Sequence, residues 1–269
     1  MKEETFWANY RIEDFERYSV ATDIVAFMIR SHWEDSYRHD SKKSLSILLI
    51  KRGEYPYMNS WALPGGFLRP DETVEDCANR EIIEETSVIP TALMHIGVFS
   101  EINRDPRGRV ISNAFVSIIG EESVKAVGGN DAIDAKWFDI SFEHTSDNYN
   151  LLTLKNEEIT LKAILKENSS KFGKTNFDII DSGEIAFDHA KIIATSLTAL
   201  RNEAKNFDLI FDFLPEKFTL AALQKVQETI MNISILPANF RRKVSDYVIE
   251  TDEYTTGAGH RPAKLFKRK

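Results

Sequence analysis

The chain has 269 residues and a formal net charge of −8, with 42% hydrophobic and 28% charged residues. This composition is ordinary for a folded globular protein and excludes a disordered or collagen-like chain. The longest apolar runs, IVAFMI and LSILLI, are far shorter than the ~20 residues of a membrane helix, so we do not expect a membrane protein.

Cysteine usage and the first residues bear on the compartment. Cys77 is the single cysteine, which rules out an intrachain disulfide and suits a reducing environment. The segment MKEETFWANY lacks the basic and apolar regions of a secretory signal. We therefore expect a cytoplasmic protein.

The first two thirds of the chain alternate between predicted strands and predicted helices. Residues 23–30 and 45–51 are rich in β-branched and other apolar side chains, and the polar segment between them, residues 31–44, is expected to be a long exposed loop. A helix is expected to begin after Asp71 or Thr73 as its N-cap and to end near Thr86. Further strands are predicted at residues 93–101, 110–119 and 135–140, and helices at residues 151–166 and 187–204.

Strands that interleave with helices favour an α/β fold, and we predict an α/β/α sandwich in which helices flank a mixed sheet. The charge distribution suggests a second, smaller unit. Residues 1–206 contain 24 Lys and Arg against 34 Asp and Glu, a net of −10, whereas residues 207–269 contain 10 against 8, a net of +2. A basic end on an acidic body suits a module that meets a polyanion, although surplus terminal charge is also common as solubilising decoration.

This carboxyl-terminal unit has its own helix signals. Thr219 is the predicted N-cap of an amphipathic run, TLAALQKVQETIM, and Pro237 opens a second, basic helix, PANFRRKVSDY. Strands are expected at residues 247–250 and 263–267, on either side of a TTGAGHRP loop. Helix, turn, basic helix and hairpin is the layout of a winged helix-turn-helix, whose second helix enters the major groove of DNA.

The most informative stretch runs from Gly65 to Val88, GGFLRPDETVEDCANREIIEETSV. Glu81, Glu84 and Glu85 stand at i, i+3 and i+4, so a helix projects them from one face, where like charges repel. Mg²⁺ takes carboxylate oxygens as ligands and leaves places for substrate phosphates. The pattern therefore indicates a metal site for phosphate chemistry, and the alternative is a solvated acidic helix face.

The spacing within this stretch is specific. Its order, Gly-x5-Glu-x7-Arg-Glu-Ile-x-Glu-Glu-x-Ser-Val, resembles the signature of the Nudix hydrolase superfamily. One position departs, because the family pattern has glycine where this chain has Ser87. If that position needs a positive φ, serine costs about 1 kcal/mol and removes no metal ligand.

The resemblance implies roles for the motif residues. It implies that Gly66, Glu81, Glu84 and Glu85 hold Mg²⁺, or Mn²⁺ in its place, and that the metal neutralises a pyrophosphate and activates a bound water. Arg80 is expected to orient a glutamate through a charged hydrogen bond, with Glu72 as its partner or in the outer metal shell. The expected catalytic residues are Glu72, Arg80, Glu84 and Glu85, and the general base stays open between Glu84, Glu85 and, outside the motif, Glu101.

An arginine-rich segment, NRDPRGRV at residues 103–110, lies between two predicted strands. Arg104, Arg107 and Arg109 suit contacts with phosphate, and an ordinary basic turn is the alternative. The surrounding sequence, GVFSEINRDPRGRVISNAFV, resembles Nudix proteins that handle ADP-ribose and related nucleotides. Trp61 and Phe67 are candidates for stacking on an adenine, and core packing is equally compatible with both.

The carboxyl-terminal unit has a family resemblance of its own. FLPEKFTLAALQKVQETI, ANFRRKV and GHRPAKLFK look like the winged domain of Nudix-related transcriptional regulators of the NrtR type. The resemblance implies contacts with double-stranded DNA, and a palindromic DNA site would require a homodimer. The alternative is a unit that packs against the Nudix domain or a second subunit and touches no DNA. The expected DNA-contacting residues are Asn239, Arg241, Arg242, Lys243, His260 and Arg261.

Two functions follow from these patterns. In the first, the protein is a Mg²⁺-dependent pyrophosphatase that cleaves ADP-ribose or a related nucleoside diphosphate derivative to AMP and a sugar phosphate, with DNA binding in the same molecule. In the second, it is an ADP-ribose-sensing transcriptional regulator of NAD or sugar metabolism with little or no hydrolysis. Every charged position of the motif is present, which favours hydrolysis. The predicted domains are a Nudix hydrolase domain at residues 1–206 and a winged helix-turn-helix domain at residues 207–269.

Overall fold

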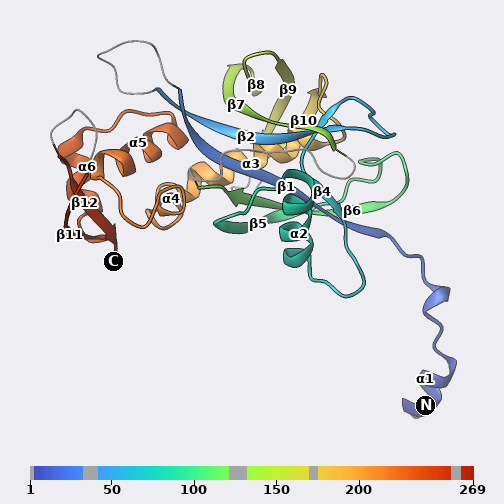
Figure 1. Ribbon diagram of the computed structural model, residues 1–269. Coiled ribbons are helices and arrows are strands. Elements are labelled where there is room, and N and C mark those ends of the chain that lie inside the picture. Colours follow the sequence, from blue (N-terminus) through green and yellow to red (C-terminus); the bar gives the residue numbers. More distant parts are fainter. Residues whose placement is uncertain (1–2, 33–41, 121–131, 170–174, 256–261) are drawn as a thin grey trace.

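A computed structural model describes residues 3–32, 42–120, 132–169, 175–255 and 262–269. Within these residues, a mixed sheet runs through the middle of the molecule (Figure 1). Its strands are β1 (Ser19–His32), β2 (Lys42–Arg52), β3 (Trp61–Ala62), β4 (Gly65–Phe67), β5 (Ala92–Phe99), β6 (Val110–Ile118), β7 (Ala132–Ser146), β8 (Tyr149–Lys155), β9 (Thr160–Ser169) and β10 (Thr175–Asp181). They lie in the order β10-β9-β8-β7-β2-β1-β6-β5, with β3 beside β2 and β4 beside β1. Strands β1 and β6 are parallel, whereas β1 pairs with β2, and β2 with β7, in antiparallel fashion.

The central strand β1 explains why both faces of the sheet are covered. Its alternate residues belong to two separate hydrophobic clusters: Ile24, Ala26 and Met28 to one, and Val25, Phe27 and Ile29 to the other. Successive side chains of a strand point to opposite faces. An uninterrupted apolar strand therefore requires that both faces of the sheet be buried.

Two helices supply this cover. Helix α2 (Val74–Thr86) contributes Ala78 and Ile82 to the cluster of Ile24. Helix α3 (His189–Glu203) contributes residues such as Ile192 and Leu197 to the cluster of Val25. The arrangement confirms the predicted α/β/α sandwich with a mixed sheet.

Helix α2 carries the glutamate motif and has a well-defined beginning and end. The Thr73 side chain accepts a hydrogen bond from the Asp76 N–H, and the Asp76 carboxylate accepts one from the Thr73 N–H, both at 3.1 Å. Of the two predicted N-caps, Thr73 is therefore the one that the helix uses. The helix ends at Ser87, which has φ 57° and ψ 19°, in the left-handed region.

We expect Ser87→Gly to raise the free energy of unfolding by up to about 1 kcal/mol, because glycine adopts the left-handed region without the steric cost of a Cβ atom. Urea denaturation followed by circular dichroism measures the difference. The matched variant is Asn232→Gly, because Asn232 ends helix α5 (Leu220–Met231) at φ 52° and ψ 48°. Asparagine tolerates this region better than serine, so the gain there should be smaller. Equal gains at both sites would contradict the strain argument.

Most other predicted elements of this part are present. Strands β1, β2, β5, β6 and β7 match the five strands predicted before residue 150, and α3 matches the helix predicted at residues 187–204. The predicted loop at residues 31–44 is narrower, because β1 continues to His32 and β2 begins at Lys42. Residues 33–41 lie outside the described residues. Strands β3, β4 and β10 were not predicted.

The helix predicted at residues 151–166 is wrong, because this segment forms the β8–β9 hairpin. The Asn156 side chain accepts hydrogen bonds from the N–H groups of Glu158 and Ile159, at 3.0 and 2.8 Å, and so fixes a turn in the middle of the segment. Buried residues alternate on each side of this turn: Leu152 and Leu154 before it, and Leu161, Ala163 and Leu165 after it. The apparent helical spacing arose because two strand patterns were joined across a turn.

The carboxyl-terminal unit consists of helix α4 (Asp208–Phe211), α5, helix α6 (Pro237–Val244) and a hairpin of β11 (Val248–Tyr254) and β12 (Lys264–Arg268). The Thr219 side chain caps α5 by accepting a hydrogen bond from the Ala222 N–H at 3.1 Å. Pro237 lies at the beginning of α6. The predicted winged helix-turn-helix layout is confirmed. Strand β11 is longer than predicted, whereas β12 has the predicted length and is shifted by one residue.

One hydrophobic cluster runs from the sheet through α3 into this unit. It includes Leu200 of α3, Phe207, Leu223 of α5 and Phe240 of α6. The predicted domain boundary between residues 206 and 207 falls in the short connection between α3 and α4. Because the hydrophobic core is continuous across this connection, it does not mark where one domain ends and the next begins. The boundary between residues 206 and 207 therefore stays a prediction.

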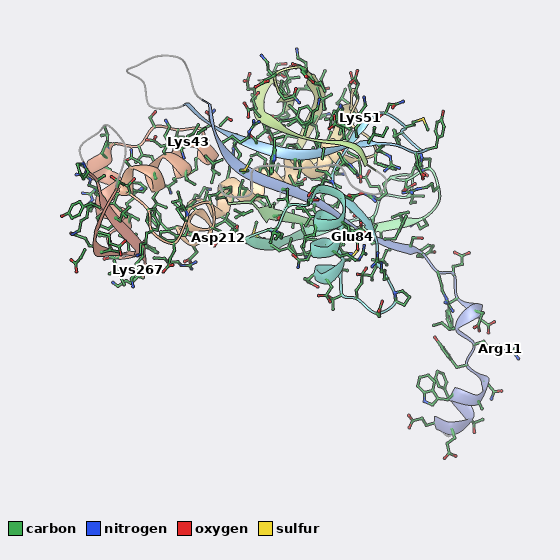
Figure 2. All side chains as sticks on the ribbon, in the orientation of Figure 1. Arg11, Lys43, Lys51, Glu84, Asp212 and Lys267 are labelled. Atoms are coloured by element: carbon green, nitrogen blue, oxygen red, sulfur yellow. The ribbon has the colours of Figure 1, made fainter. Side chains whose placement is uncertain are left out.

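The amino-terminal segment contains helix α1 (Glu3–Asn9) and the 3-10 helix η1 (Ile12–Asp14), and it extends away from the sheet (Figures 1 and 2). Phe6, Trp7 and Phe15 are exposed in it. Among the described residues, no helix is long and apolar enough to cross a membrane.

Candidate functional site

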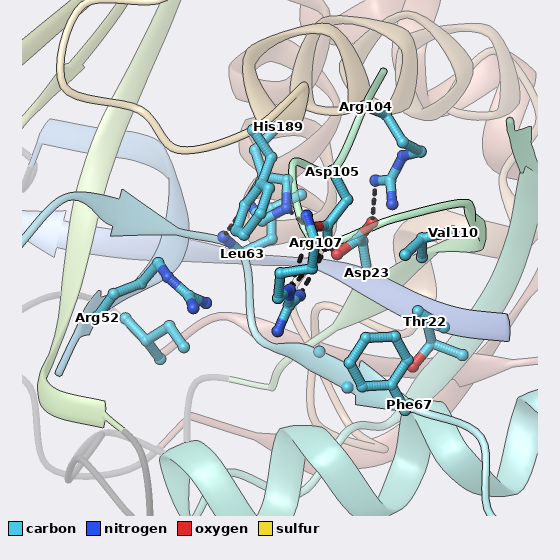
Figure 3. A pocket seen from close by; sticks show the side chains of 15 residues that line it. Thr22, Asp23, Arg52, Leu63, Phe67, Arg104, Asp105, Arg107, Val110 and His189 are labelled. Carbon is cyan, nitrogen blue, oxygen red and sulfur yellow. Dashed lines mark hydrogen bonds and ion pairs between the residues drawn. The ribbon is translucent and has the colours of Figure 1, made fainter. Parts of the chain in front are cut away.

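A cleft opens where the glycine pair before α2, the arginine-rich loop and the beginning of α3 meet (Figure 3). It consists of two adjoining hollows. The larger, about 240 Å³, reaches Glu81 and Glu85 of α2, and the other reaches Asp23, Arg104 and His189. We call the combined space the cleft; the residues that line both hollows are Ile50, Arg52, Gly65, Gly66, Phe67 and Arg107.

The acidic wall of the cleft is formed by Gly66, Glu81 and Glu85. The Glu85 side chain is buried, and its Oε2 accepts a hydrogen bond from the Gly65 N–H at 2.9 Å. A Cβ atom on Gly66 would lie 2.2 Å from Glu81 Oε1, so any other residue here would push the Glu81 carboxylate out of its present position. Three of the four predicted metal-binding residues are therefore brought together.

Arg80 lies among the remaining acids of the motif. Its Nε and Nη2 donate to the two carboxylate oxygens of Glu72, at 2.9 and 2.6 Å. Its Nη1 donates to Glu81 at 2.5 Å and to Glu84 at 3.3 Å. The hydrogen bonds from Arg80 lower the pKa of Glu72 to about 2, so Glu72 is charged at neutral pH and holds the guanidinium in place. Neither Glu72 nor Glu84 lines the cleft.

A second group of metal-ligating side chains was missed by the sequence analysis. Asp23, Asp188 and His189 are, among the described residues, the group whose ligand atoms all lie within 4.8 Å of one another. However, Arg104 already bridges the two carboxylates, with Nη2 2.8 Å from Asp23 and 2.7 Å from Asp188. This guanidinium therefore balances part of their charge. The motif supplies a separate set of carboxylate oxygens, the ligands that Mg²⁺ takes.

Asp23 lies at the centre of this buried network. The Leu63 N–H donates to His189 Nδ1 at 2.9 Å, which leaves the ring proton on Nε2, 3.3 Å from Asp23. The Ser112 hydroxyl also donates to Asp23, at 2.6 Å. Burial alone would raise the pKa of Asp23, but its partners His189, Arg104 and Ser112 outweigh burial and hold the pKa well below its usual value.

We expect Asp23→Asn to lower the free energy of unfolding by about 2–3 kcal/mol at pH 7. The substitution removes one of the two buried carboxylates that pair with Arg104 and leaves only Asp188 to balance the guanidinium charge. A carboxylate whose pKa is depressed by folding stabilises the folded state at pH values above its unfolded pKa of about 3.9. This contribution is lost as the pH falls from 3.9 towards the lower pKa of the folded state. The difference between wild type and variant should therefore shrink below about pH 4. Urea denaturation at pH 7 and pH 3 measures it, with the exposed Asp178→Asn as the control. A constant difference would contradict the assignment.

The opposite wall of the cleft combines arginine and aromatic side chains. Arg107 lies between two rings, with Cζ 5.1 Å from the centroid of Phe67 and 5.7 Å from that of Phe187. Arg52 lies 5.0 Å from the Phe187 ring. Phe187 has φ 51°, a strained value for a bulky residue and one that is typical of functional sites. Rings beside a guanidinium suit a planar base attached to a diphosphate.

The places of Arg52 and Phe187 in the cleft were not predicted, because the two residues come from elements far apart in the chain. Their sequence signal is weak. Phe187 is an apolar residue two positions before α3, and no motif surrounds Arg52.

Three predicted binding residues lie elsewhere or are already bonded. Trp61 is buried in the core, with its ring 4.9 Å from that of Phe138, so the core-packing alternative holds. Arg109 donates to the Ser100 carbonyl at 2.6 Å and does not line the cleft. Arg104 lines it but is held by the buried carboxylates. Glu101, the base considered outside the motif, is paired with Lys191.

Helix α6 presents a basic surface. Its residues Phe240 and Val244 are buried against the core. None of the ion pairs in the described part of the chain includes a basic side chain of α6, so that charge faces solvent. The exposed residues are Asn239, Arg241, Arg242 and Lys243, and the predicted contacts His260 and Arg261 lie outside the described residues.

Known proteins resemble both parts of the chain. A NUDIX domain is recognised in residues 37–151 and the NrtR DNA-binding winged helix domain in residues 210–267. The ADPR responsive transcriptional repressor NtrR of Acinetobacter baylyi is 26% identical over 268 residues, 98% of this chain and 88% of the relative. The ADP-ribose pyrophosphatase of Methanocaldococcus jannaschii is 48% identical over 101 residues, 37% of this chain and 58% of the relative. The crystal structure of a MutT/nudix family protein from Enterococcus faecalis has a TM-score of 0.73 and 25% identity, and covers 99% of this chain and 92% of its own.

The sandwich, with its glutamate-bearing helix beside the cleft, is a Nudix domain. Because an NrtR DNA-binding winged helix domain follows it, the chain combines the two domains that the resemblance to NrtR-type proteins implied.

Proposed function

We propose that this protein is an ADP-ribose-binding transcriptional regulator, in which a ligand in the Nudix cleft lowers the affinity of the winged helix domain for DNA. The observation that carries the proposal is the similarity, over 98% of the chain, to a protein named as an ADPR responsive transcriptional repressor. Neither half of the chain alone accounts for a function that joins a nucleotide ligand to DNA.

The cleft supports the choice of ligand. ADP-ribose has a planar base, a diphosphate and a second sugar. The rings of Phe67 and Phe187 suit the base. Arg107, which lies half-exposed between them and is paired with Asp105 at 2.7 Å, suits the diphosphate. Ligand sites of this kind combine a few charged groups with aromatic walls.

The basic surface of α6 supports the choice of DNA as the partner. A recognition helix contacts phosphates and base edges in the major groove, and arginine is the commonest partner of guanine. We further propose a homodimer, because a palindromic DNA site is read by two copies related by a twofold axis.

Hydrolysis of ADP-ribose to AMP and ribose 5-phosphate is the second proposed activity. It is supported by the complete set of motif charges and by the 48% identity to an ADP-ribose pyrophosphatase. Nudix hydrolases generally use divalent metals, and the Gly66 carbonyl, Glu81, Glu84 and Glu85 supply the hard oxygen donors that fit Mg²⁺ or Mn²⁺. The metal, when bound, neutralises the diphosphate and lowers the pKa of a water ligand.

The protein's own residues prepare this chemistry. Glu85 is oriented by the Gly65 N–H, and Arg80, itself held by Glu72, orients Glu81 and Glu84. Arg107 would then hold the diphosphate against the acidic wall, since it lines the same hollow as Glu81 and Glu85.

The experiment uses the full chain and a labelled DNA duplex that the protein itself has selected from a random pool. Fluorescence anisotropy with EDTA, which prevents turnover, measures DNA affinity with and without ADP-ribose. AMP release with Mg²⁺ is measured separately. Weaker DNA binding in the presence of ADP-ribose supports the regulator. Failure to select DNA, or a DNA affinity indifferent to saturating ADP-ribose, overturns it. AMP release alone leaves a hydrolase.

A further inference from the structure

Helix α3 extends from the cleft to the winged helix domain. Its first residue, His189, lines the cleft, and the residue before it, Asp188, is bonded to Arg104. Its last turn carries Arg201, and Ala204 follows directly. A helix of 15 residues spans about 22 Å and moves as a stiff rod, so a displacement at one end is transmitted to the other.

The end of α3 at the cleft is bonded to groups that a ligand would meet. Arg104 donates through Nε and Nη2 to the Asp188 carboxylate, at 3.0 and 2.7 Å. Phe187, whose ring packs against Arg107, lies two residues before the helix and has a positive φ. A base that enters between Phe67 and Phe187 competes with Arg107 for the same space. Because the base takes the place of Arg107 beside Phe187, the ligand binds some positions of the Phe187 backbone more tightly than others. A ligand shifts a conformational equilibrium only through such a difference in affinity.

The other end of α3 is bonded to α5 of the winged helix domain. The Gln227 side chain is buried, and its Nε2 donates to the Ala204 carbonyl at 2.9 Å. Arg201 Nε donates to the Ile230 carbonyl at 3.2 Å. Both acceptors are backbone carbonyls, so these hydrogen bonds fix the position of the α5 backbone relative to the end of α3.

We propose that α3 is the element that couples the cleft to DNA binding, and that the Gln227–Ala204 and Arg201–Ile230 hydrogen bonds pass its displacement to α5. This inference rests on the proposed function as a ligand-responsive regulator. It assigns to Gln227 and Arg201 a role in regulation, although neither residue touches the cleft or the basic surface of α6. Helix α5 also packs beside β2, and this contact is the alternative path by which a change in the Nudix domain could reach the winged helix domain.

The test measures a coupling factor, defined as the ratio of DNA dissociation constants with and without saturating ADP-ribose, in EDTA. The variants are Gln227→Leu and Arg201→Met, singly and together. The matched control is Gln224→Leu, because Gln224 also lies on α5 and donates to a backbone carbonyl, that of Ile235 at 2.7 Å, but wholly within the winged helix domain. We expect the double variant to reduce the coupling factor about threefold or more, and the control to leave it unchanged. Affinity for ADP-ribose without DNA should change less than about twofold, since reciprocal coupling acts only when both ligands are present.

Each outcome separates the inference from the proposed function. A coupling factor that is present in wild type and unchanged in the folded variants overturns the role of α3 and favours the β2 route. Equal losses in Gln227→Leu and Gln224→Leu also overturn it, because they would reflect general loosening of the winged helix. If wild type itself shows no coupling, the proposed function fails, and the inference fails with it. Thermal melting of each variant shows whether it is folded. If Gln227→Leu does not fold, Arg201→Met, at a half-buried position, provides the test of coupling in its place.

Discussion

Glu85→Gln is expected to lower Mg²⁺-dependent AMP release from ADP-ribose by about 100-fold or more, equivalent to ~2.7 kcal/mol of transition-state stabilisation. The substitution keeps the size of the side chain but removes its charge. Glu85 lies at the acidic wall, where the Gly65 N–H holds one of its oxygens. The variant therefore loses both the charge of a proposed metal ligand and the strong, charge-assisted form of that hydrogen bond.

Glu75→Gln is the matched control, because it changes the same residue type on the exposed first turn of the same helix. It should retain wild-type turnover. Glu84→Gln tests the remaining glutamate, which lies outside the cleft and beside Arg69 and Arg80. Turnover should be lost in this variant too if Glu84 joins the metal site on binding. Full activity of Glu85→Gln, with its fold intact, would show that the acidic wall is not the reaction centre.

Arg241→Ala combined with Arg242→Ala is expected to weaken DNA binding by about 10- to 100-fold at physiological salt, because two cations facing solvent on α6 are removed. If both contact phosphates, the slope of log K against log salt concentration should become less steep by about 1.8. Anisotropy titrations at several salt concentrations give both quantities.

The matched control is Arg11→Ala with Arg17→Ala, which removes the same charge from exposed positions. These lie in the amino-terminal segment, on the far side of the molecule from the winged helix domain (Figure 2). An effect of the lowered net charge alone would weaken DNA binding in both double variants, whereas contact through α6 affects only the first. An unchanged salt slope in the α6 variant would exclude that surface as the DNA contact.

The sequence predicted those parts of the fold that depend on local rules. The Thr219 cap was predicted, and Thr73 was one of the two predicted N-caps of α2, because each depends on a few neighbouring residues. The capping box with Asp76 was not predicted, and a positive φ at Ser87 was considered only as a condition. The wrong helix at residues 151–166 marks the limit of such rules, since a turn held by one asparagine side chain changed the apolar period.

The candidate site was predictable for the acidic wall and, on the opposite wall, for Phe67 and Arg107. Gly66, Glu81 and Glu85 are close in sequence and lie on one loop and one helix, so their spacing carries a signal. The buried network joins Asp23 of β1, Arg104 of a loop and His189 of α3, which only the folded sheet brings together. The same holds for Phe187 and Arg52, and no periodicity links such distant positions.

The hydrophobic cluster shared by the sheet, α3, α5 and α6 has a consequence for how the chain comes apart. Leu200, Phe207, Leu223 and Phe240 belong to one packed body, so the DNA-binding part cannot lose its structure without uncovering apolar surface on the nucleotide-binding part. Melting is therefore a shared, cooperative event rather than two separate ones. Any molecule that binds in the cleft protects the distant DNA-binding helices from heat as well, by mass action on the whole chain.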